Sequence, residues 1–256
     1  MTEFDLVLYE KHEGIATITF NDPKKKNAAS ARLVSGFVKA FEQAEDDDDV
    51  MVTILTGAGD VFMAGADLTT FPTNIKEGRK FTDDGSRNIF RRLETFPKPV
   101  IAAVNGPCLG GGVEIPLFCD ITVASTLATF AIPEVSLGVI PGFAVLRLHQ
   151  LVGRQKAKEL IMTCDAIDAV EAYRIGLVNK VVPHSHLMDA CLEMAGKIKT
   201  KAPLAIRMVK SLVNRELGGP EINAMINGIS LLFNSEDLSE GMRSFAERRP
   251  PVFKGK

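Results

Sequence analysis

The 256-residue sequence lacks several patterns that would identify a common class of site. Its four cysteines, Cys108, Cys119, Cys164 and Cys191, form no C-x-x-C pair and have no zinc-site spacing. We therefore expect unpaired apolar thiols in a reducing compartment, and a cytoplasmic protein. G-x-S-x-G, H-E-x-x-H and the nucleotide loops are missing too, which argues against a serine hydrolase, a zinc protease and a nucleotide-binding protein.

Charge and hydrophobic runs are also modest. The formal net charge is −2, which gives no reason to expect nucleic acid or a membrane surface as a partner. No apolar run approaches the roughly 18 residues of a membrane span, and residues 1–14 have no secretory or transit character. His184 and His186 have no third ligand nearby in the sequence, so we expect no metal site.

Strand and helix signals alternate through the first half of the chain. Two short apolar runs flank His12-Glu13-Gly14 and predict a β-hairpin over residues 6–20. Ser30 is suited to cap a helix that runs to about Ala44. Further buried strands are expected at 50–56, 100–104 and 121–124, and mainly helices from residue 143 onward. This order predicts an α/β fold with a parallel sheet.

The sequence is organised around residues 96–124. An apolar strand, Val100 to Val104, is followed by the glycines 110–112 and by Glu114 at the start of an apolar helix. Three consecutive glycines suit a backbone that comes close to a ligand with its N–H groups free. The positive end of the helix dipole lies at the same turn. The free N–H groups and the dipole together can stabilise a developing negative charge. The small residues Ala64 to Ala66, followed by Asp67, predict a second close approach.

Glu114 and Glu134 each stand in apolar surroundings. Burial raises the pKa of a carboxyl group, and two carboxyl groups with different pKa values can divide the acid and base steps of a reaction. Alternatively, each is a helix cap or a paired buried acid, and on spacing alone this simpler explanation is preferred.

Four blocks of sequence resemble the crotonase superfamily of enoyl-CoA hydratases and isomerases, in the family's order: Ala64–Leu68, Lys98–Gly106, Leu109–Glu114 and Pro133–Gly138. The resemblance implies a crotonase-like spiral of ββα units over residues 1–195. It also implies a C-terminal helical trimerisation region over 196–256, and a trimer or hexamer. The apolar stripes of the C-terminal helices are equally consistent with packing on another subunit and with covering their own sheet.

The resemblance also implies the roles of individual residues. The N–H groups of Ala66 and Gly111 would form an oxyanion hole for a thioester carbonyl. Glu114 would act as base on a water molecule and Glu134 would protonate the α-carbon. The residues expected to contact the substrate are Ala64, Asp67, Leu68, Gly142, Phe143 and Lys25. Coenzyme A enters as part of the substrate, and no further cofactor is expected.

Both glutamates together favour reversible hydration of a trans-2-enoyl-CoA to a 3-hydroxyacyl-CoA. One segment differs from the family pattern, because Phe143 stands where hydratases have small residues after Pro-Gly. Its ring is expected to narrow the acyl pocket or to crowd the water. The alternatives are therefore an enoyl-CoA isomerase or another crotonase-type reaction, and a catalytically silent acyl-CoA binder.

Overall fold

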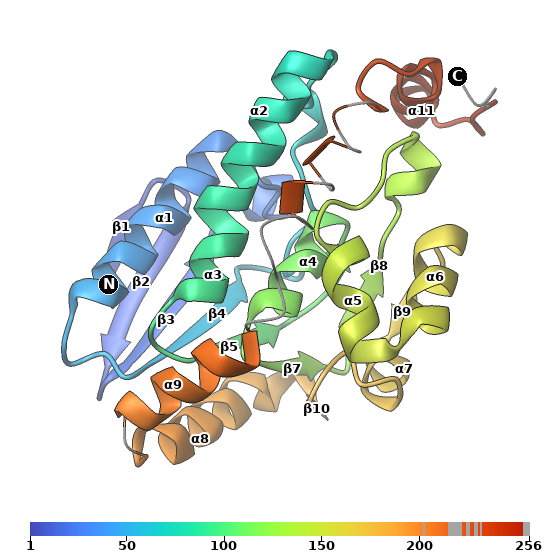
Figure 1. The fold of residues 1–256 in the computed structure, drawn as a ribbon. Helices are drawn as coiled ribbons and strands as arrows, with labels where there is room; N and C mark the ends of the chain where they lie inside the picture. The colour runs from blue at the N-terminus through green and yellow to red at the C-terminus, as the bar shows by residue number, and fades with distance from the viewer. Residues whose placement is uncertain (202, 215–221, 224–225, 228–229, 231, 253–256) are drawn as a thin grey trace.

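The computed structural model describes residues 1–201, 203–214, 222–223, 226–227, 230 and 232–252 (Figure 1). A seven-stranded sheet has the order β1-β2-β3-β4-β5-β7-β10. Its strands are β1 Thr2–Phe4, β2 Val7–His12, β3 Ile15–Phe20, β4 Val52–Gly57, β5 Val100–Val104, β7 Ile121–Ser125 and β10 Lys180–Val182. β1, β2 and β3 pair antiparallel, whereas β3, β4, β5, β7 and β10 pair parallel. The predicted hairpin and the predicted parallel sheet are both confirmed.

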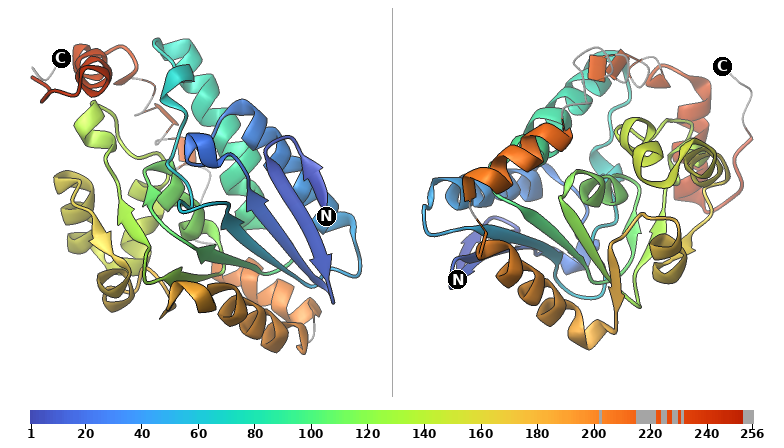
Figure 2. Two further views of the ribbon diagram at one scale, coloured as in Figure 1. Left: turned by 180° about the vertical axis from the view of Figure 1, so that it is seen from behind. Right: turned by 60° about the horizontal axis from the view of Figure 1, so that its bottom comes forward.

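A smaller sheet of β6 Cys108–Leu109, β8 Thr129–Ala131 and β9 Ile167–Asp168 lies beside the large one. Figure 2 shows helices α6 and α7 on the outer side of this sheet. The described helices are α1 Ala31–Asp46, α2 Ile75–Gly85, α3 Arg91–Thr95, α4 Gly111–Phe118, α5 Ala144–Val152, α6 Arg154–Thr163, α7 Ala169–Arg174, α8 Leu187–Lys199, α9 Pro203–Val213 and α11 Glu236–Glu247.

Strand β5 is buried on both faces, as its uninterrupted apolar sequence predicts. Val100, Ala102 and Val104 face the main core, and Ile101 and Ala103 face a second core under α8. All five residues are fully buried. The helix α1 covers the main-core side of the sheet, and α8 covers the other side (Figure 1). The glycine turn and α4 follow the carboxyl end of β5, so they are anchored at the edge of the large sheet.

Local signals set the ends of several elements. The Ser30 hydroxyl accepts a hydrogen bond from Leu33 N at 3.3 Å and caps α1, as predicted. A segment of π-helix, Ser86–Phe90, joins α2 to α3. Short 3₁₀ turns are formed by η1 Pro23–Lys25, η2 Leu68–Thr70, η4 Glu134–Leu137 and η5 His184–His186.

The C-terminal apolar stripes divide between exposed and buried positions. On α9, Leu204, Met208 and Val209 are exposed. The second apolar stripe expected from the sequence consists of Ile222, Met225, Ile226, Ile229 and Leu232. The side chain of Leu212, and residues 225 and 229 of the second stripe, lie outside the described residues. Ile226 of that second stripe is buried in the main core. The described members of the second stripe thus pack on their own chain, whereas Leu204, Met208 and Val209 of α9 are open to contact.

All four cysteines are free thiols. In the described part of the chain, no helix is long and apolar enough to cross a membrane.

Candidate active site

The three glycines at the start of α4 lie against two other segments of the chain. Gly110 has φ +53°, a left-handed conformation that glycine adopts without strain. A β-carbon at Gly110 would lie 2.8 Å from Oε1 of Glu134, and one at Gly112 would collide with the Met63 carbonyl. The missing side chains therefore let an acid and a backbone segment approach the helix start.

The backbone amides of Ala66 and Gly111 lie close to each other and to Glu114. A β-carbon built on Gly111 would lie 4.0 Å from Ala66 N and 3.9 Å from Oε2 of Glu114. One built on Gly65 would lie 3.4 Å from Gly111 N, so the two segments are in contact. Within the described part of the chain, neither the Ala66 N–H nor the Gly111 N–H has a protein acceptor. Two unused donors thus lie beside a carboxylate.

Glu114 is buried in the first turn of α4, with 5% of its surface exposed. Its Oε1 accepts hydrogen bonds from Phe143 N at 2.6 Å and Ala144 N at 2.9 Å. These amides belong to the N-terminal end of α5, where the helix dipole also favours a negative charge. Burial raises the pKa of Glu114, and the two amide hydrogen bonds oppose that rise. Oε2 remains directed toward the space beside Gly111.

Glu134 begins the η4 turn directly after Pro133. Its Oε2 is buried and has no hydrogen-bond partner among the described residues. Burial, and next the charge of Glu114, raise the pKa of Glu134 to about 8. The two acids therefore differ at neutral pH: Glu134 holds its proton, whereas Glu114 has the amide donors that stabilise a carboxylate.

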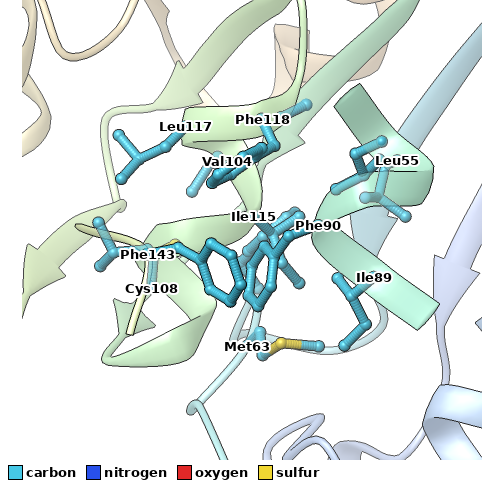
Figure 3. Close-up of a cluster of buried hydrophobic side chains, with 14 of the residues drawn as sticks. Leu55, Met63, Ile89, Phe90, Val104, Cys108, Ile115, Leu117, Phe118 and Phe143 are labelled. Carbon is cyan, nitrogen blue, oxygen red and sulfur yellow. The ribbon is translucent and has the colours of Figure 1, made fainter. Parts of the chain in front are cut away.

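Phe143 is placed by an aromatic cluster (Figure 3). Its ring lies 4.1 Å, between centroids, from that of Phe90 and 5.6 Å from that of Phe118. Only 4% of Phe143 is exposed. The large side chain thus fills the core between the π-helical segment Ser86–Phe90, α4 and the start of α5, while its own amide holds Glu114. Gly142, which is expected to contact the substrate, lies next to it in the turn that leads into α5.

Asp67 is tied into its own loop. Its carboxylate accepts from the Thr69 backbone at 3.0 Å and hydroxyl at 2.6 Å, and pairs with Lys25 Nζ at 3.1 Å. The Thr69 hydroxyl and then Lys25 lower the pKa of Asp67. Leu68 opens η2 immediately after it. Asp67 therefore braces the Ala66 loop against the turn that carries Lys25.

Sequence reasoning placed the two acids and the two amides, and the structure brings all four together. It did not identify the amides of Phe143 and Ala144 as the partners of Glu114. Backbone donors carry no side-chain signature, and the only local signal is the Pro141-Gly142 turn before a helix start. In the described residues, no group of three or more His, Cys, Asp or Glu side chains is arranged to hold a metal ion.

Comparison with known proteins identifies the family. The model of the family described as "Enoyl-CoA hydratase/isomerase" matches residues 10–256. The chain belongs to this family, within the crotonase superfamily. It is 44% identical over 253 residues to the short-chain-enoyl-CoA hydratase of Clostridium acetobutylicum, a match that covers 96% of this chain and 97% of the relative. It is 40% identical to the crotonyl-CoA hydratase of Syntrophomonas wolfei, over 98% of both chains.

Solved crotonase structures have the same fold. The carnitinyl-CoA hydratase from Mycobacterium avium superposes with a TM-score of 0.88 at 33% identity, over 98% of this chain and 99% of that one. A methylmalonyl-CoA decarboxylase in complex with 2-nitronate-propionyl-CoA also has a TM-score of 0.88, at 31% identity, over 99% and 100% of the two chains. The crotonase-type α/β fold predicted from the sequence is thus confirmed.

Proposed function

We propose that this protein is an enoyl-CoA hydratase that adds water reversibly to a trans-2-enoyl-CoA, with Glu114, Glu134 and the amides of Ala66 and Gly111 as its catalytic groups. Two relatives that match nearly the full length of the chain are hydratases of this kind. The observation that carries the assignment is the buried, unpartnered Glu134 oxygen beside Glu114 and two unused amides.

The amides act on the thioester carbonyl. As water adds to the β-carbon, electrons of the double bond move toward the carbonyl oxygen, which gains negative charge. Donation from Ala66 N and Gly111 N stabilises this oxygen in the transition state more than in the substrate. A single donor of this kind contributes about 10²–10³ in rate.

The two acids move the protons. Glu114, as a carboxylate, takes a proton from the water while the water oxygen bonds to the β-carbon. Glu134, held protonated by burial, delivers its proton to the α-carbon. The net reaction adds one water, and the proton on Glu114 must return to Glu134 before the next turnover.

Short acyl chains are the preferred substrate. The two hydratases named above are a short-chain-enoyl-CoA and a crotonyl-CoA enzyme. Ala64, Asp67, Leu68, Gly142 and Lys25 are proposed to line the path of the substrate, with coenzyme A as part of the substrate and no separate cofactor.

The activity is tested with purified protein and crotonyl-CoA, by following the loss of the enoyl absorbance. Gly111→Pro is the informative variant: proline is well accepted at a first helical position, but it removes the N–H donor and adds ring carbons close to Ala66 N and Oε2 of Glu114. We expect a loss of at least about 10²-fold in kcat with the fold retained. A 3-enoyl-CoA substrate distinguishes a hydratase from the alternative, an enoyl-CoA isomerase. An isomerase would form the 2-enoyl product without the hydroxyacyl product. Binding of CoA ester without turnover of either substrate would identify a silent binder.

Assembly and location complete the proposal. The exposed apolar residues of α9 support self-association as a trimer or hexamer through the region after residue 195. Four free cysteines are compatible with a reducing, cytoplasmic compartment. Light scattering of the purified protein measures the assembly state, and a monomer at micromolar concentration would contradict the proposed trimer or hexamer.

A further inference from the structure

Asn27 is fully buried, and its side-chain amide ties one loop to a neighbouring turn. Oδ1 accepts from Asp22 N at 2.9 Å. Nδ2 donates to the carbonyls of Ala58 at 3.0 Å and Val61 at 2.8 Å, and also lies 3.3 Å from the Phe62 carbonyl. One side chain thus satisfies several buried backbone groups from two segments about 30 residues apart.

The loop that carries Asn27 has an unfavourable conformation of its own. Lys26 has φ +53° and Asn27 has φ +55°, two consecutive left-handed residues without a glycine. Such residues are strained and persist only where surrounding contacts hold them. Asparagine tolerates this conformation, and its buried hydrogen bonds supply the contacts.

The same loop holds the backbone immediately before Ala66. Ala64 N donates to the Lys26 carbonyl at 3.0 Å, and Ala29 N donates to the Gly65 carbonyl at 2.8 Å. On its other side, Gly65 lies so close to the carbonyl of Leu109 that a β-carbon would stand 2.8 Å from it. The segment before Ala66 is therefore clamped between the Asn27 loop and the glycine turn.

We propose that Asn27 is a positioning residue for the oxyanion hole: its side-chain amide fixes the loop that sets the direction of the Ala66 N–H. Asn27 itself contacts no reacting atom. The inference rests on the proposed function, in which Ala66 N donates to the thioester oxygen. A displacement of about 1 Å in such a group is enough to lower a rate about 10²-fold.

Asn27→Asp tests this inference, because aspartate keeps the shape and tolerates positive φ but has no N–H donors for the three carbonyls. Asn27→Gly is the second variant, since glycine accepts φ +55° and adds no charge, which keeps the test available if the aspartate variant does not fold. Asn105→Asp is the matched control. Asn105 is also buried and braces the same turn through Gly57 N at 3.2 Å and the Gly59 carbonyl at 3.0 Å, but its hydrogen bonds do not reach the Asn27 loop.

Three quantities are measured: kcat and KM with crotonyl-CoA, and the absorption maximum of bound 2,4-hexadienoyl-CoA, which moves to longer wavelength when its carbonyl is polarised. The melting temperature is followed in parallel. For the Asn27 variants we expect kcat to fall about 10- to 100-fold, KM to change less than about threefold, and the wavelength shift to shrink. Asn105→Asp is expected to lower the melting temperature but to keep the shift and most of kcat.

The inference is overturned if folded Asn27 variants keep both kcat and the shift, or if Asn105→Asp loses as much of both. Failure of the proposed function has a different signature. In that case the unaltered protein hydrates no enoyl-CoA, while the bound dienoyl-CoA still reports whether Asn27 controls carbonyl polarisation.

Discussion

The raised pKa of Glu134 makes a quantitative prediction about the pH dependence of hydration. An ordinary glutamate with a pKa of 4.5 would be about 0.3% protonated at pH 7. With the pKa at about 8, about 90% of Glu134 carries its proton at that pH. Burial is the larger cause and the charge of Glu114 the second. The site thereby keeps a proton donor available under neutral conditions.

The direction of the pH dependence follows from the proposed role of Glu134 as the acid. Glu134 must be protonated to act as acid in the hydration direction, so activity is present below the pKa and is lost as pH rises through it. We expect kcat/KM for crotonyl-CoA to be level near pH 7 and to fall about tenfold per pH unit above about 8. The assay follows the enoyl absorbance from pH 6 to 10, with a blank for thioester hydrolysis.

Two variants sharpen this test. Glu134→Gln removes the titrating proton, so we expect a loss of about 10²–10⁴ in kcat and no remaining fall near pH 8. Glu114→Gln removes the neighbouring charge, which lowers the pKa of Glu134, as carbon-13 NMR of labelled glutamate carboxyls would detect. A level profile through pH 10, or near-normal turnover by Glu134→Gln, would refute the assignment of Glu134 as the acid.

Three further outcomes are expected. Gly110→Ala should lower kcat at least tenfold, because its β-carbon would lie 2.8 Å from a carboxylate oxygen of the second glutamate and its φ is +53°; an unchanged kcat would contradict the close approach. Phe143→Ala should lower the free energy of unfolding by about 3 kcal/mol in urea, and unchanged stability would contradict the packing of its ring on Phe90 and Phe118. Lys210→Met should lower the free energy of unfolding by about 2 kcal/mol, since it breaks the partly buried pair with Asp120 at 2.8 Å. The exposed control, Lys197→Met, should cost less than about 0.5 kcal/mol.

Prediction from sequence worked best where the signal was local. The Ser30 cap, the hairpin and the continuously apolar strand β5 each depend on residues within a few positions of one another. The glycine turn was also visible, because three glycines in a row have few other structural uses. These features set the order of strands and helices and the place of the candidate site at the end of β5.

Contacts between distant segments could not be predicted in this way. Glu114 receives its hydrogen bonds from amides 29 and 30 residues later. The direction of the Phe143 ring depends on Phe90 and Phe118. Sequence alone suggested that this ring would crowd the site, whereas the structure buries it in an aromatic cluster. The hydrophobic periodicity of the sequence does not predict which buried aromatic rings will be in contact.

The sequence by itself determined the elements and the family, because backbone conformation, capping and the alternation of buried positions are encoded over a few residues. Only the tertiary structure decided the chemistry of the two acids. Their pKa values depend on how much water packing removes and on which charges it brings near. Burial leaves Oε2 of Glu134 without a hydrogen-bond partner among the described residues, and the start of α5 gives Glu114 two donors.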